Sequence, residues 1–300
     1  MTWLAPLGIG TVMGLLLCLA VMGLALSFNL LDFPDITMEG SLPLGATVFA
    51  ASVKSGMPLM MALTAAMLAG AAAGGLTAFI HSRFGIGKFL AGILVVAISY
   101  TLCLRLLGTS NIGLLGSPSL FDYVEPLDRH AADLPVGTAL LLLVAALAAG
   151  AFVLWLAQTR GGLRARVAGT NPVYARSLGI NVPLHLVAGL GITNAMAAAA
   201  GALLAMHQGF ADVGMGQGAL ILCLASMAIG ARLVPQRKLP AHLFVIVSAA
   251  LGSVIYQVLV AFAIRLGLSP VDLKLATALL VLAVVVARAR GNGSLAAVRA

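Results

Sequence analysis

The sequence predicts an all-α polytopic membrane helix bundle with about eight full spans plus half or broken helices. Of the 300 residues, 61% are hydrophobic and only 9% are charged, and the mean hydropathy is +1.10. A soluble domain carries roughly a quarter charged residues, so this chain has too little charge to coat a water-facing surface. The composition excludes a soluble enzyme, a nucleic-acid binder and a disordered chain. The abundant glycine fits closely packed membrane helices better than an outer-membrane barrel.

Apolar runs give the elements in order, since a span takes about 20 mostly apolar residues. We expect full spans at 5–30, 57–80, 89–107, 135–159, 184–206, 218–234, 240–266 and 271–287. The run 42–53 is about half that length and fits a re-entrant or broken helix. The first run has no basic residue before it, so we expect an uncleaved helix rather than a signal peptide. Residues 1–300 are expected to form one transmembrane domain.

The distribution of Lys and Arg predicts the orientation, because cytoplasmic loops are enriched in both. The short basic segments 81–88, 160–181 and 231–239, and the tail from Arg288, are expected in the cytoplasm. The acid-rich segments 32–39 and 108–133 are expected outside. Eight spans with both termini cytoplasmic satisfy this pattern, provided that 42–53 enters and leaves on the outer side. The net charge of +8 is then a topology signal and does not indicate nucleic acid as a partner.

The sequence lacks the patterns of catalytic, metal and nucleotide sites. The five histidines are scattered, the three cysteines lie singly in apolar runs, and no nucleophile elbow is present. Residues 85–88 lack the glycine spacing of a phosphate-binding loop. We expect no enzyme activity, no metal and no cofactor, so any ATP hydrolysis would come from another subunit. The near absence of acids from the spans argues against a proton or sodium symporter, although sodium sites built from backbone carbonyls stay possible.

Residues 160–183 form a polar loop that contains a short helix with both ends specified. Asn171 is a favoured N-cap, Pro172 a favoured first helical residue, and Gly179 a favoured C-terminal stop. A helix this short is marginal in water, so it needs packing against the protein's own helix ends or in a partner's cleft. The alternative is a capped loop that only connects two spans.

The run 209–218 holds four glycines in ten residues, which cannot continue a helix cheaply. Two interpretations of this run stay open: it is an element of the pathway or its gate, or it is an ordinary external turn in which Asp212 is a cap. The residues expected to line the path or gate are Asn194, His207, Phe210, Asp212, Gly214 and Gly216. For Asn194, which lies within a span, hydrogen bonding between helices is the alternative. His207, at a span end, is expected to be interfacial.

The run from Ala168 to Asn181 resembles the cytoplasmic coupling segment of ABC importer permeases of the branched-chain amino acid and ribose type. The run Gln208–Gly218 is similar to one subgroup of these permeases, whose members are described as tryptophan/tyrosine or uncharacterised transport components. Further stretches fit the same subgroup: 40–46, 90–94, 111–115, 193–195, 200–203 and Gly230. The likeness covers about residues 40–285.

The resemblance implies a type II-like ABC importer permease in a bacterial inner membrane, for an amino acid or related compound. Two copies of the chain would form the path as a homodimer, two cytoplasmic ATPase subunits would hold the coupling segments, and an extracytoplasmic binding protein would deliver the substrate. The coupling residues would be Ala168, Gly169, Asn171, Pro172, Tyr174, Ala175, Arg176 and Gly179. Tyr174 and Arg176 are expected contacts, since Tyr and Arg are enriched at interfaces. The alternatives are a gradient-driven carrier or facilitator without an ATPase, and a scaffold that transports nothing.

Overall fold

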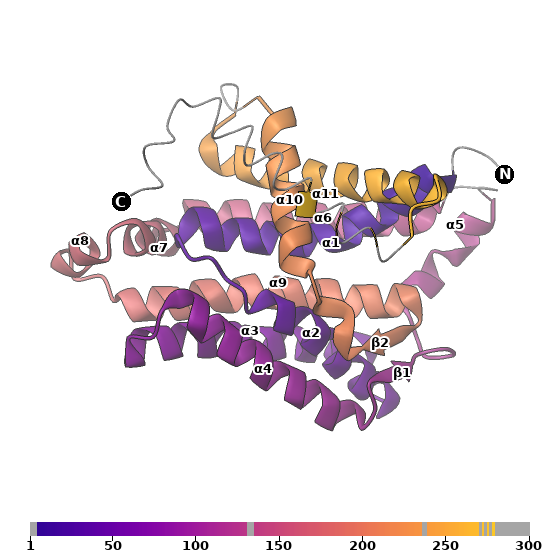
Figure 1. The fold of residues 1–300 in the computed structure, drawn as a ribbon, viewed down its shortest axis with the longest axis horizontal. Helices are drawn as coiled ribbons and strands as arrows, with labels where there is room; N and C mark the ends of the chain where they lie inside the picture. Colours follow the sequence, from indigo (N-terminus) through magenta and orange to yellow (C-terminus); the bar gives the residue numbers. More distant parts are fainter. Residues whose placement is uncertain are drawn as a thin grey trace.

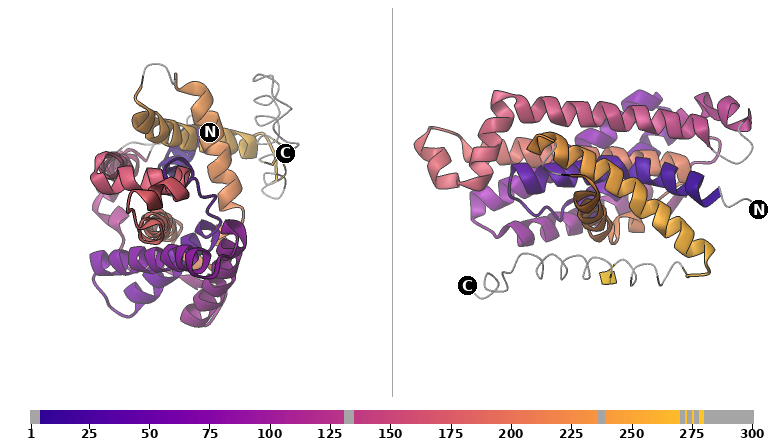
Figure 2. Two further views of the ribbon diagram at one scale, coloured as in Figure 1. Left: turned by 90° about the vertical axis from the view of Figure 1, so that its left-hand side faces the viewer. Right: turned by 90° about the horizontal axis from the view of Figure 1, so that it is seen from above.

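The computed structural model describes residues 5–130, 135–235 and 239–269, together with the single residues 272, 275, 278 and 279. Most of the long helices lie roughly along one axis, with α7 and α8 at one end of the molecule, whereas α10 runs across that axis (Figures 1 and 2). The elements are α1 (Ala5–Leu30), α2 (Met38–Lys54), α3 (Leu59–Phe84), α4 (Lys88–Leu107), β1 (Asn111–Gly113), η1 (Leu120–Tyr123), α5 (Glu125–His130), α6 (Val136–Gln158), α7 (Arg160–Thr170), α8 (Pro172–Ser177), α9 (Val182–Gln208), β2 (Phe210–Asp212), η2 (Val213–Gly216), α10 (Ala219–Leu233) and α11 (Ala241–Arg265).

Seven segments within the described residues are long and apolar enough to cross a membrane. They confirm seven of the eight predicted spans, each within a few residues of its predicted ends. The eighth, 271–287, lies outside the described residues except at single positions. The fold class predicted from the composition, an all-helical polytopic bundle, is therefore confirmed.

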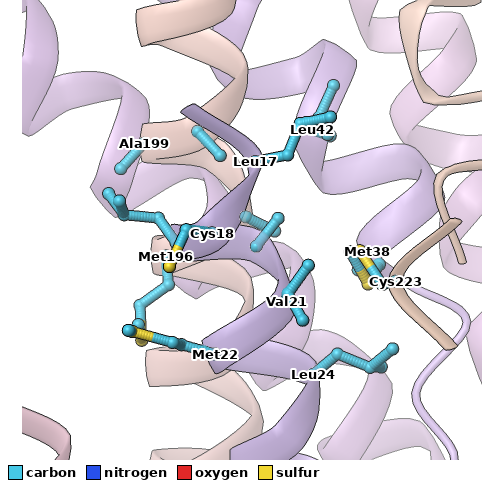
Figure 3. Packing of buried hydrophobic residues seen from close by; sticks show 14 of the residues in the cluster. Leu17, Cys18, Val21, Met22, Leu24, Met38, Leu42, Met196, Ala199 and Cys223 are labelled. Atoms are coloured by element: carbon cyan, nitrogen blue, oxygen red, sulfur yellow. The ribbon is translucent and has the colours of Figure 1, made fainter. Parts of the chain in front are cut away.

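Helices α1 and α9 form the centre of the bundle. In an 18-residue apolar stretch of each span, the buried share is 83% for α1 and 78% for α9. In the other five spans it is between 22% and 39%. Figure 3 shows side chains of α1, among them Cys18 and Met22, in the core with Met196 of α9. The apolar side chains that the outer spans leave exposed form the surface that lipid covers in a membrane protein.

Glycines let the central helices approach closely. Gly45 of α2 lies against Ala198 of α9, and Gly201 of α9 lies against the backbone of Leu42. Gly70 and Gly74 of α3 face α9 in the same way. Because the contacts at these glycines include backbone atoms of the neighbouring helix, a larger side chain could not be accommodated by a change of rotamer.

The acid-rich segment 32–39 begins at the same end of the bundle as the basic turn between α3 and α4. Lys88 Nζ donates a hydrogen bond to the backbone carbonyl of Asp32 at 2.6 Å, and Nζ lies 5.5 Å from the centroid of the Phe33 ring. The prediction that 32–39 lies at the end opposite the basic loops is wrong. Membrane topology follows Lys and Arg, and acidic residues contribute little to it. The three acids of this segment were therefore a poor guide to the side on which it lies.

From that end the chain descends as non-helical backbone to residue 37 and continues as α2 in the direction of α4. Gly92 of α4 lies beside Ile36 and Thr37, and one to two turns further along Gly40 packs on Val96 and Ser99. The segment 31–54 therefore makes one broken crossing. The broken-helix interpretation of 42–53 is confirmed, but the expectation that this piece enters and leaves on one side is wrong.

The first helix consequently runs in the direction opposite to the expected one. Its last turn is next to α7, where Gly169 contacts the backbone of Leu31, and its first turns pack along the second half of α11, where Gly10 meets Val258. Figure 2, right panel, shows α11 running beside α1. The expectation that α1 begins at the end with the basic loops is wrong. With α1 reversed and 31–54 counted as a crossing, the described basic segments still share one end.

Candidate functional site

Helix α8 has the predicted caps at both ends. Asn171 Oδ1 accepts a hydrogen bond from the backbone N–H of Tyr174 at 3.0 Å, and Pro172 is the first helical residue. At the other end Gly179 has φ of +73°, its N–H donates to the carbonyl of Arg176 at 3.0 Å, and the N–H of Ile180 donates to the carbonyl of Ala175 at 3.0 Å. This pair of bonds is a Schellman motif, which favours glycine at the left-handed position.

Helix α7, which the sequence analysis did not predict, holds α8 against the bundle. The side chain of Thr159 caps α7 by accepting a bond from the N–H of Gly162 at 3.2 Å. Ala168 and Ala175 are buried, and Gly169 lets the backbone of α7 reach Leu31. The short helix was expected to pack either on the protein's own helix ends or in a partner's cleft. The structure shows packing on the protein's own helix ends. Figure 2, left panel, looks onto this end of the molecule.

The outer face of α8 is apolar although it lies at the basic end. Val173 is 75% exposed, Tyr174 55% and Leu178 56%. Arg176 on the same helix is also exposed, as are Asn171, Pro172 and Gly179. A group of large apolar side chains, rimmed by charge and lying beyond the membrane-length helices, is typical of a protein-binding surface. Val173 and Leu178 were not singled out from the sequence, although their large apolar side chains in a polar loop were visible there.

A buried polar network joins the break before α2 to the middle of α9. Asn194 Nδ2 donates to Asp35 Oδ2 at 2.6 Å, and Ser41 Oγ donates to Asn194 Oδ1 at 2.7 Å. Asp35 Oδ1 accepts from the N–H of Thr37 at 2.9 Å. All four side chains are fully buried. The hydrogen-bonding interpretation of Asn194 is confirmed. Asp35 was missed because its segment was placed outside the bundle.

The glycine-rich run folds back onto the first turn of α2. Asp212 Oδ1 accepts from the N–H of Gly214 at 2.6 Å, so the predicted capping role of Asp212 is confirmed. Gly216 lies against the backbone of Glu39, whose Oε1 accepts a 3.4 Å bond from the N–H of Leu220 at the start of α10. The first turn of α2 therefore contacts Asn194, Gly216 and α10.

His207 and Phe210 lie away from this junction, at the end of the bundle opposite α8. The His207 ring packs edge-on against Phe121 with centroids 5.4 Å apart. Phe210 and Asp212 belong to β2, which pairs antiparallel with β1 and links the segments that follow α4 and α9. The six residues predicted for the path thus divide between the α2 junction and this end, and their lining of a path stays a prediction.

These features, a bundle of membrane-length helices with one broken crossing and a capped helix presented at the basic end, fit the class of membrane transport permeases. Residues 7–286 match the family described as the permease component of the branched-chain amino acid transport system. The chain is 34% identical over 270 residues to the tyrosine transport system permease protein of Clostridioides difficile (strain R20291), covering 90% of this chain and 86% of that protein. It is 29% identical over 256 residues to an uncharacterised protein of Rickettsia prowazekii (strain Madrid E), covering 85% of this chain and 88% of that protein. The chain belongs to this permease family, and it is a permease component of an ABC-type transport system.

Proposed function

We propose that the chain is the transmembrane subunit of an ATP-driven importer for an amino acid or a related small solute. The observation that carries the proposal is the capped helix α8, which is packed on the bundle at Ala175 and presents Val173, Tyr174 and Leu178 outward. The basic end is then cytoplasmic, and separate ATPase subunits bind α8 there. The substrate class is supported by the name of the tyrosine permease relative.

The remaining partners follow from the same proposal. A second copy of the chain completes the path as a homodimer in the bacterial inner membrane. A substrate-binding protein docks at the opposite end, where β1 and β2 lie. The eight coupling residues then divide into those that support α8 and those that face the ATPase. Ala168, Gly169 and Ala175 are buried supports, whereas Tyr174 and Arg176 are exposed contacts.

The contacts suggest how ATPase closure would reach the path. Displacement of α8 moves α7, whose Gly169 rests on Leu31. Leu31 leads into the non-helical segment that ends at Asp35 and Thr37, and Asp35 is bonded to Asn194. A push at α8 therefore acts on the break before α2, where a non-helical backbone absorbs a change of angle at a lower cost than a continuous helix would.

The test is uptake into proteoliposomes that contain the chain with its ATPase and binding protein. Val173→Asp with Leu178→Asp places charges on the proposed interface and should reduce ATP-driven uptake at least tenfold. The matched control is Leu115→Asp, a similar change at a residue that is 93% exposed and far from α8. Because Leu115 follows β1 at the end where the binding protein is proposed to dock, the two variants are compared by ATPase co-purification, which Leu115→Asp should leave unchanged. Unchanged uptake by the double variant contradicts the coupling role. Uptake by the chain alone, without ATPase, supports the gradient-driven carrier instead.

A further inference from the structure

A pocket at the basic end of the bundle combines a hydrocarbon wall with two basic side chains. It is a shallow, partly open pocket of about 30 Å³ where α1, α6, α7 and α11 meet. The polar side chains in its wall are Asn29, Arg166 and His242. The rest of the wall is aliphatic and includes Leu26, Val153 and Ile246. The proposed function makes no use of this pocket.

The depth of the pocket corresponds to the boundary between lipid headgroups and acyl chains. Asn29 is in the last turn of α1, Ala157 in the last turn of α6, and His242 in the first turn of α11. All three are membrane-length helices, so their ends mark the surface of the hydrocarbon layer. The aliphatic residues Ala25, Val153 and Ile246 lie about one turn deeper, where acyl chains lie.

Arg166 is a partly buried cation that forms no ion pair with any residue the structure describes. A guanidinium removed from water is stabilised by an anion that accepts its forked N–H groups, and phosphate oxygens suit that fork. Basic pockets between spans on the cytoplasmic side bind the headgroups of anionic lipids. Free phosphate would satisfy Arg166 but would leave the aliphatic wall without a partner.

We propose that this pocket binds one anionic phospholipid, with its phosphate on Arg166 and His242 and its first methylenes against Val153 and Ile246. The site requires only that the basic end lies at the membrane surface, and it is independent of the proposed ATPase coupling. Since α7 carries both Arg166 and Gly169, the bound lipid would also brace the helix that supports α8.

The experiment is native mass spectrometry of the full chain after delipidation and addition of phosphatidylglycerol or phosphatidylcholine. We expect one phosphatidylglycerol to be retained in preference to phosphatidylcholine. Arg166→Gln should lower its retention about fivefold to tenfold, as expected for loss of a charged contact to an anionic headgroup. The matched control is Arg164→Gln on the exposed side of α7, which should have no such effect. Equal loss in both variants, or none in either, overturns the proposal.

Two further arms separate the possible outcomes. Millimolar inorganic phosphate should not displace the lipid; displacement would mean a simple anion site and would overturn the lipid assignment. Photocrosslinking with an acyl-chain diazirine analogue of phosphatidylglycerol uses the unaltered chain, so it does not depend on whether the variants fold. The label should fall on α6 and α11 near Val153 and Ile246. Labelling spread over the outer faces of α3 and α4 without enrichment at these two positions would contradict the site.

Discussion

Asn194 Nδ2 and Asp35 Oδ2 lie 2.6 Å apart in the interior of the bundle, although 159 residues separate them in the chain. The bond ties the break before α2 to the central helix α9. The bond satisfies Asp35 Oδ2, and an unsatisfied buried polar group costs about 1–3 kcal/mol in a protein interior. Asn194 Nδ2 also donates to the backbone carbonyl of Leu190 at 2.9 Å.

Asn194→Ala removes a donor to Asp35 and an acceptor for Ser41 together. We expect a loss of stability of about 2 kcal/mol or more, because an acidic side chain and a hydroxyl then stay buried with fewer partners. Thermal unfolding in detergent measures it. Asn111→Ala is the control, since Asn111 is exposed and its pairing with Asp212 is through the backbone. Similar melting temperatures for the two variants would contradict the importance of the network.

Gly169→Val should disturb the contact between α7 and the end of α1. A side chain at residue 169 would meet the backbone of Leu31 at 2.5 Å, and backbone cannot yield as a rotamer would. Gly161→Val, on the same helix, meets only the Thr159 hydroxyl at 3.7 Å and is the matched control. Transport and melting temperature should fall for Gly169→Val alone. If both variants keep the transport rate and melting temperature of the original chain, the contact between α7 and the end of α1 contributes to neither.

Because Gly179 has a left-handed backbone conformation, substitutions at this residue should impair ATPase binding to different degrees. Proline fixes φ near −65° and removes the N–H that bonds to Arg176, so Gly179→Pro should break the end of α8 and abolish ATPase binding. Gly179→Ala should cost about 1 kcal/mol. Asparagine accepts φ above zero more readily and should retain most activity. ATPase co-purification and ATP-driven uptake measure the three variants. A Gly179→Pro variant that binds ATPase and transports normally would show that the glycine cap of α8 has no functional role.

Single cysteines test both the interface and its side of the membrane. Val173→Cys should react with a membrane-impermeant maleimide in inside-out vesicles, and bound ATPase should protect it. Leu115→Cys should react only in right-side-out vesicles and should not be protected. The native Cys18, Cys103 and Cys223 are free and buried, so they should give little background. Labelling of both sites from one side would refute the proposed orientation.

Local sequence patterns alone predicted the membrane spans and the ends of α8. The lengths of the apolar runs gave seven spans, because a bilayer sets the number of residues that a helix needs. The residues Asn171, Pro172 and Gly179 gave both ends of α8, because capping depends on a few neighbouring backbone groups. The abundant glycine indicated closely packed membrane helices, and Gly70 and Gly74 of α3 do lie against α9.

Tertiary structure decided the direction of α1 and the burial of Asp35. The segment 32–37 carries two acids, a proline and no helical period, which favours a water-exposed loop when it is considered alone. Its insertion depends on partners that are distant in sequence: Lys88 at its entry, Thr77 beside Thr37, and Asn194 on Asp35. A buried polar group is stable only where such partners already lie, and their position follows from the packing of the whole bundle rather than from any local pattern.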